Sequence, residues 1–228
     1  MKKNPIIGVV ALWWLAAVAG ASAIWLATLL PALALVTATL LWLCTAMVYA
    51  CLRFIEEWAH PLTFVNFVLI GLSSGFLLFA ALAASSGDVE VVKSLGPAAL
   101  LLTVAAGAGR ALALQRNAGL RHRSTLQSAT GIRAPRLVQT SMGMSAGSFN
   151  TREFFHRASQ AALRRIRLAL FVLGFALPAL LALLAIATGS IVAWWLAVLV
   201  QLPGLLADRW LFFAQAKHPQ NLYYQVVS

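Results

Sequence analysis

Long apolar segments separated by shorter polar stretches dominate the chain. Six such segments lie at about residues 5–23, 25–52, 61–84, 95–114, 168–187 and 191–213. Each is near the roughly 20 apolar residues that one helix needs to cross a bilayer. The pattern therefore predicts an all-α fold, a single polytopic membrane bundle of about six transmembrane helices.

The boundary between the first two segments is the least clear, because only the weakly polar stretch 20–22 separates them. The N-terminus also resembles a signal peptide: Met1-Lys2-Lys3-Asn4 precedes an apolar run that ends in the A-x-A pattern Ala21-Ser22-Ala23. Cleavage there would leave five spans. A retained first helix fits the pattern as well, because Trp13 and Trp14 lie in the middle of the run.

Composition excludes a soluble domain and indicates an orientation. Of the 228 residues 61% are hydrophobic and 10% are charged, whereas soluble proteins carry about 25% charged residues. The net charge of +11 comes mostly from eleven arginines between Arg110 and Arg167, while Lys93 stands alone on the opposite side. Short cytoplasmic loops accumulate Lys and Arg. The loop and both termini are therefore expected in the cytoplasm, and the positive charge is expected to face membrane lipid rather than nucleic acid.

The basic loop at 115–167 is the largest polar region. The sequence Asn150-Thr151-Arg152-Glu153 has the capping-box pattern that opens a helix. We predict an interfacial helix that leads into the fifth span, either as a ramp at the headgroups or as a docking surface for an acidic partner protein. Residues expected to contribute to docking are Arg121, Arg123, Arg133, Arg136, Arg152, Glu153, His156 and Arg157.

A second group of polar residues follows the second span. Arg53, Glu56, Glu57 and His60 would share one face if the helix continued through them. Ionisable groups at a membrane boundary can line a proton or quinol route, or they can cap helices and anchor to headgroups.

Near the ends of other spans, Asp208 and Arg209 are expected to form an interfacial pair. Arg110 is expected to anchor its helix by reaching toward the headgroups.

Several chemistries lack the residues they need. The four histidines lie outside the predicted spans, so paired axial ligands for a haem inside the bundle are not expected. The two cysteines are too few for an iron–sulfur cluster or a structural zinc site. No nucleophilic triad, phosphate-binding loop or dinucleotide fingerprint is present. We therefore expect no catalytic residue, haem or metal in this chain alone.

Three stretches resemble a known family. They are Ser-Thr-Leu-Gln-Ser-Ala-Thr-Gly-Ile at 124–132, Gly-Ser-Phe-Asn-Thr-Arg-Glu-Phe-Phe-His at 147–156, and residues 208–224, which begin Asp-Arg-Trp-Leu-Phe-Phe-Ala-Gln. Together with Cys44–Arg53 and Pro61–Thr63, they resemble the membrane anchor subunit of the dimethyl sulfoxide reductase family, DmsC. The resemblance covers most of the chain from about the second span onward.

The resemblance implies a haem-free anchor in the bacterial inner membrane. Such an anchor holds a molybdopterin catalytic subunit and an iron–sulfur subunit, oxidises menaquinol and passes the electrons to the iron–sulfur subunit in anaerobic respiration. The family's upstream helix pair, with a His-Leu-Gly-x-Pro stretch and a glutamate associated with quinol oxidation, has no counterpart here. The first helices of the family are expected to be missing, and those quinol residues are not transferred to Glu56 or His60.

Two other function classes remain open. A small transporter could use Gln201 and Pro203 along a substrate path, although no internal repeat of the kind common in transporters is visible. A non-catalytic assembly factor would bind the same partner subunits without reacting with quinol. The terminal electron acceptor is not encoded in this chain, because the catalytic subunit selects it.

Overall fold

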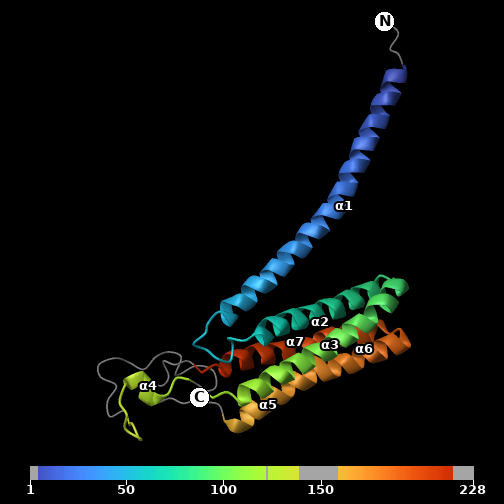
Figure 1. The fold of residues 1–228 in the computed structure, drawn as a ribbon. Coiled ribbons are helices and arrows are strands. Elements are labelled where there is room, and N and C mark those ends of the chain that lie inside the picture. Colours follow the sequence, from blue (N-terminus) through green and yellow to red (C-terminus); the bar gives the residue numbers. More distant parts are fainter. Residues whose placement is uncertain (1–4, 122, 139–158, 218–228) are drawn as a thin grey trace. The chain divides into compact units, whose positions relative to one another are not determined.

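The computed structural model describes residues 5–121, 123–138 and 159–217, and these residues form helices and connecting turns without a strand (Figure 1). The expected all-α membrane architecture is confirmed. Five helical segments of the described residues are long and apolar enough to cross a membrane. The chain divides into two compact units, Met1–Thr45 and Ala46–Ser228.

The first helix, α1 (Pro5–Ala50), is continuous over 46 residues. The turn predicted between spans 5–23 and 25–52 is therefore wrong. The stretch from Gly20 to Ala23 contains neither a proline nor a charged residue, and alanine favours helix. A single glycine costs a helix only about 1 kcal/mol, so nothing in this stretch ends the helix.

Within the first unit, α1 is apolar on every side. Leu33, Leu35 and Val36 point to three different sides of the helix and are each more than 55% exposed. The hydroxyls of Thr28 and Thr37 donate to the carbonyls of Ile24 and Leu33, at 3.0 and 2.8 Å. The polar groups are thus satisfied within the helix, as a segment in lipid requires.

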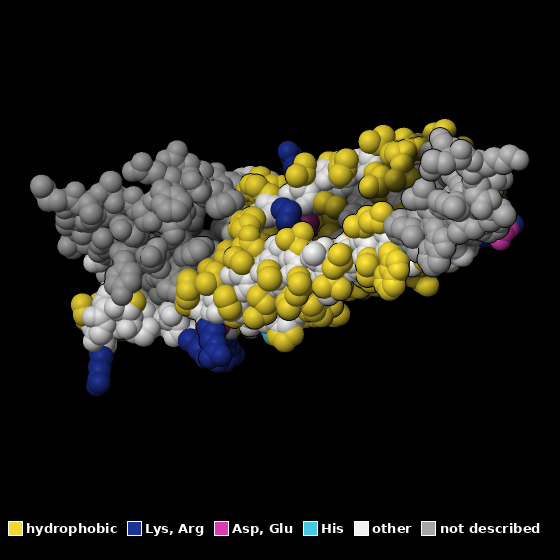
Figure 2. Space-filling view, turned by 90° about the horizontal axis from the view of Figure 1, so that it is seen from above, with side chains coloured by type: hydrophobic (Ala, Val, Ile, Leu, Met, Phe, Trp, Pro, Cys, Tyr) yellow, Lys and Arg dark blue, Asp and Glu magenta, His cyan; other side chains and the backbone are white. Residues whose placement is uncertain are grey.

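The second unit is a bundle of long helices that lie side by side (Figure 1). The hairpin of α2 (Pro61–Ser85) and α3 (Val89–Ala118) packs against α7 (Ile191–Ala214) and against a composite helix, which consists of α5 (Gln160–Phe171), the π-helical turn η3 (Val172–Ala176) and α6 (Leu177–Thr188). Figure 2 shows that hydrophobic side chains make up most of the visible surface of the described residues.

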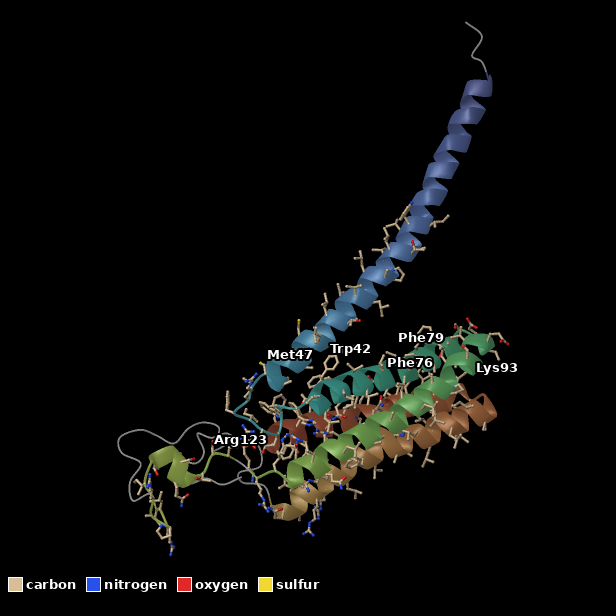
Figure 3. The ribbon with its side chains drawn as sticks, in the orientation of Figure 1. Trp42, Met47, Phe76, Phe79, Lys93 and Arg123 are labelled. Atoms are coloured by element: carbon tan, nitrogen blue, oxygen red, sulfur yellow. The ribbon has the colours of Figure 1, made fainter. Side chains whose placement is uncertain are left out.

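The connections define two ends of the bundle. Residues 51–60, 119–138 and 215–217 lie at one end, which we call the loop end. The turns at 86–88 and 189–190 lie at the other, the hairpin end. Lys93 and Arg123 accordingly lie at opposite ends (Figure 3). The loop end includes the short helix α4 (Leu126–Thr130).

Small residues line the contacts between the helices. Ala80, Ala99, Ala182 and Ala197 are completely buried around Trp194. Small side chains allow helix backbones to approach closely, which is how helices associate where both partners and solvent are apolar. A close approach lies at Gly174 and Gly204, where a Cβ on Gly204 would overlap the Gly174 backbone.

Candidate functional site

A buried charge cluster lies between α3 and α7 toward the loop end. Asp208 is completely buried, Arg110 is 3% exposed, and Arg110 Nε lies 2.5 Å from Asp208 Oδ1. The neighbouring Arg209 donates from Nη2 to Asp208 Oδ2 at 2.5 Å. The expected Asp208–Arg209 pair is present, but the carboxylate also lies against Arg110 and away from the surface.

The expectation that Arg110 reaches toward the headgroups is wrong. Arg110 follows Thr103 by seven residues, which is close to two helical turns, so both lie on one face of α3. That face also carries Ala106 and Ala113 and packs into the bundle. An arginine there lies among the helices, and the Asp208 carboxylate provides its opposite charge.

Aromatic rings surround the cluster at the loop end. The Arg209 guanidinium carbon lies 4.5 Å from the ring centre of Phe67 and 5.2 Å from that of Phe212. The Phe212 ring stacks on Trp58, whose indole nitrogen donates to the Phe212 carbonyl at 3.1 Å. Tyr49 packs edge-on against both Trp58 and Phe212. These contacts hold the segment before α2 against α7.

That segment, residues 51–60, forms turns rather than a continuation of α1. The single helix face predicted for Arg53, Glu56, Glu57 and His60 is therefore absent. Arg53 is exposed, whereas Glu57 is 6% exposed. Pro61 accounts for the last residue of the segment, because a residue before proline is driven toward extended backbone and His60 has φ −149° and ψ 147°. It does not account for the end of α1 at Ala50.

Glu56 connects this segment to the chain that follows α3. Its carboxylate accepts from the backbone nitrogen of Arg123 at 2.9 Å, and its carbonyl accepts from Arg116 Nη1 at 3.0 Å. Glu56 thus has a structural role at the loop end.

His60 caps the N-terminus of α2. Its Nδ1 accepts from the backbone nitrogen of Leu62 at 3.1 Å, which requires the neutral imidazole. Partial burial, and to a smaller degree the positive charge of Arg116, lower the pKa of His60 below its ordinary 6.5.

Replacing His60 by Ala is expected to lower the free energy of unfolding by about 1 kcal/mol, because the first turn of α2 loses its cap. Since the folded pKa is the lower one, the unfolded chain binds the proton more readily, and stability falls as the pH drops through 6.5. In His60→Asn, whose side chain caps without titrating, this part of the fall should disappear. Thermal unfolding of the detergent-solubilised chain above and below pH 6.5 tests both effects, and an equal pH dependence in wild type and His60→Asn would contradict the assignment.

A small cavity lies beside the charge cluster. It has room for about one water molecule. Its walls come from α2, α3, α7 and the turn before α2: Glu57, His60, Leu62, Thr63, Asn66, Phe67, Arg110, Ala113, Arg116, Asn117, Arg209, Phe212 and Gln215. The cavity thus brings Glu57 and His60 from the predicted group together with Arg209 from the predicted pair.

A second polar layer lies deeper in the bundle. Gln201 Nε2 donates to Ser73 Oγ at 3.1 Å and lies 3.4 Å from the carbonyl of Gly174 in η3. Ser73 and Thr103 share a hydrogen bond of 2.9 Å between their hydroxyls. The side chain of Gln201 therefore links three helical elements, which is a structural role that the transporter interpretation did not consider.

Four of the residues predicted for docking can be located. Arg121, Arg123, Arg133 and Arg136 are exposed beyond the end of α3. Arg152, Glu153, His156, Arg157 and the capping box at 150–153 lie outside the described residues, as do His122 and His218. The described helix that leads into the fifth span begins at Gln160 and is capped by Ser159. Among the described residues, no group of three His, Cys, Asp or Glu side chains could hold a metal ion.

Comparisons with known proteins give two findings. The family model described as DMSO reductase anchor subunit (DmsC) matches residues 4–215. A protein from Allochromatium vinosum that is named as a sulfite dehydrogenase subunit is 46% identical over 203 residues, which are 89% of this chain and 62% of the relative. The chain thus spans about three fifths of the length of that relative. No solved structure matches significantly.

Proposed function

The chain belongs to the family of DMSO reductase anchor subunits (DmsC), and we propose that it is the membrane anchor of an oxidoreductase complex. The observation that carries the proposal is the family match over residues 4–215, which includes nearly the whole described bundle. Helices that could cross a membrane and exposed arginines beyond α3 support it.

The proposed partners are an iron–sulfur subunit and a molybdopterin catalytic subunit. They dock at the loop end, where Arg121, Arg123, Arg133 and Arg136 offer positive charge to an acidic surface. The bundle exchanges electrons between a quinone in the membrane and the iron–sulfur subunit. The protein lies in the bacterial inner membrane, with the loop end and the C-terminus in the cytoplasm according to the distribution of arginine and lysine. The cytoplasmic N-terminus expected for six spans does not fit one continuous α1, because a helix that crosses the membrane once has its two ends on opposite sides.

For the substrate of the complex we favour sulfite, because the relative that is 46% identical is named a sulfite dehydrogenase subunit. Sulfite would be oxidised in the catalytic subunit, and its electrons would pass through the iron–sulfur subunit to a quinone, which takes up protons and becomes quinol. The family description supports a second candidate, in which electrons run from menaquinol to dimethyl sulfoxide in anaerobic respiration.

Affinity purification of the tagged chain from native membranes tests the anchor proposal. We expect a molybdopterin subunit and an iron–sulfur subunit to co-purify. The purified complex should then reduce a water-soluble quinone with sulfite; oxidation of menaquinol with dimethyl sulfoxide would instead favour the second candidate. Partners that co-purify without either reaction would indicate an assembly factor, and co-purification with transport proteins alone would contradict the anchor function.

A further inference from the structure

We propose that a second, larger cavity, between the loop ends of α3, α5 and α7, binds the phosphate group of an anionic phospholipid, with Arg167 and Lys217 supplying the opposite charge. These three helix ends lie next to one another (Figure 1). The site goes beyond the proposed function, because it requires neither the quinone nor the substrate of the complex. Neither cation is among the docking residues predicted from the sequence.

The cavity has room for a lipid headgroup. Its volume is about 280 Å³, whereas one water molecule needs about 10–15 Å³. The space exists because α5 packs against α7, while α3 contacts the composite helix mainly at η3 and α6. The loop ends of α3 and α5 therefore leave an opening, which residues of both helices line together with residues of α7 and of the segments before α2 and after α7.

The walls of the cavity change from apolar to polar residues. On α3, Leu114 is followed one turn later by Asn117, and on α7, Leu211 is followed by Gln215; all four line the cavity. On α5, Arg167 comes directly before the apolar run that begins at residue 168. A change of this kind in neighbouring membrane helices marks the boundary between the hydrocarbon core and the headgroups. The cavity is therefore assigned to the level at which lipid phosphates lie.

The charges of the lining favour an anion. Arg167 and Lys217 contribute two positive charges and Glu57 one negative charge, so the lining has a formal excess of one positive charge. A phosphodiester group carries one negative charge and balances this excess. Within the described part of the chain, neither cation forms an ion pair or a hydrogen bond with another residue, and both are exposed. Their donors are thus available to phosphate oxygens, which arginine binds especially well.

A phospholipid matches this lining better than other anions do. Leu114, Leu163 and Leu211 contribute apolar surface to the same cavity as the two cations. A phospholipid carries a charged phosphate and apolar chains in one molecule, whereas free phosphate or an acidic side chain of a partner protein would match the cations alone. Basic pockets between membrane helices on the cytoplasmic side are typical sites for anionic headgroups.

Native mass spectrometry of the full chain, purified in mild detergent with the subunits that accompany it, tests the site. The probes are dioleoyl phosphatidylglycerol, dioleoyl phosphatidylcholine and inorganic phosphate, each titrated separately. The variant is Arg167→Gln/Lys217→Gln. The matched control is Arg164→Gln/Arg165→Gln, which removes the same charge from exposed residues of α5 that do not line the cavity. All four cations are exposed, so both variants should fold, and thermal unfolding checks this.

We expect wild type to bind phosphatidylglycerol more tightly than phosphatidylcholine. Arg167→Gln/Lys217→Gln should weaken phosphatidylglycerol binding about tenfold, equivalent to about 1.4 kcal/mol, because two cations that face an anionic headgroup lose their charge. The control should bind as wild type does, and Arg167→Lys, which keeps the charge, should retain most of the affinity. Unchanged affinity in Arg167→Gln/Lys217→Gln would overturn the proposal, as would an equal loss in the control, which would indicate general attraction to surface charge.

The remaining outcomes separate the possible occupants. Equal affinity of wild type for both lipids would indicate unselective surrounding lipid, and binding of inorganic phosphate without phosphatidylglycerol would indicate a site for the free anion; each contradicts the lipid assignment. If Arg167→Gln/Lys217→Gln keeps its lipid affinity but loses the accompanying subunits, the cavity binds a partner protein instead. Selective, charge-dependent lipid binding in a chain without oxidoreductase partners would leave the lipid site standing while the proposed anchor function fails.

Discussion

Replacing Asp208 by Asn is expected to lower the free energy of unfolding by about 3–5 kcal/mol, because it leaves the Arg110 guanidinium buried without an opposite charge. Arg110 is 3% exposed and lies 2.5 Å from the carboxylate in the native bundle. The same change also removes the partner that Arg209 contacts from the adjacent position. The measurement is thermal unfolding of the detergent-solubilised chain, together with its yield in membranes.

Two further variants show whether the loss comes from the unpaired charge. In Arg110→Met/Asp208→Leu both charges are absent, and removing a buried pair together is often neutral, so most of the lost stability should return. Asp88→Asn also neutralises a carboxylate, but Asp88 is an exposed helix cap and asparagine caps equally well; its stability should be unchanged. A double variant as unstable as Asp208→Asn would show that packing, not the charge, accounts for the effect.

The position of this charge cluster was only partly readable from the sequence. Thr103 and Arg110 are seven residues apart, as are Gln201 and Asp208, and this spacing places each pair on one helix face. The faces could have been recognised as polar faces that point into the bundle. Arg110 and Asp208 meet because α2 and the composite helix, which pack against both α3 and α7, hold these two helices in place. No local pattern in the sequence encodes that arrangement.

Asn66 carries a sequence signal for a buried position. It is the only amide side chain in the apolar run 61–84, and a polar residue inside a membrane helix usually faces protein rather than lipid. Its position beside Gly109 depends on the close approach of two helices, which a single helical pattern does not reveal. The burial of Asn66 was therefore predictable, whereas its neighbours were not.

For the group at 53–60, the sequence pattern predicted a helix face that is absent from the structure. The spacing of its charges matched a helix face, but Pro61 immediately follows, and the residue before a proline avoids helical backbone. Pro61 therefore accounts for the extended backbone of His60, whereas the end of α1 at Ala50 lies too far upstream for it. Between the first two predicted spans the polar signal of the sequence was too weak to end a helix, and helix propensity kept α1 continuous.

Replacing Gly204 by Ala is expected to lower the free energy of unfolding by about 3 kcal/mol, at the upper end of the usual cost of overpacking. The added methyl group would overlap the backbone of Leu173 and Gly174 in the π-helical turn η3. Backbone atoms cannot rotate away as a side chain can, so α7 must move from η3. That movement would also lengthen the contact between Gln201 and the Gly174 carbonyl.

Gly75 is the matched control, because it lies in α2 with open space around the position of a Cβ. In Gly75→Ala the stability should be unchanged or raised by up to about 1 kcal/mol, since alanine favours helix over glycine. Thermal unfolding of both variants in one detergent measures the difference between them. Equal stability of Gly204→Ala and Gly75→Ala would mean that α7 and η3 do not approach through their glycines. The close contact of α7 with η3 beside Gln201 would then be wrong.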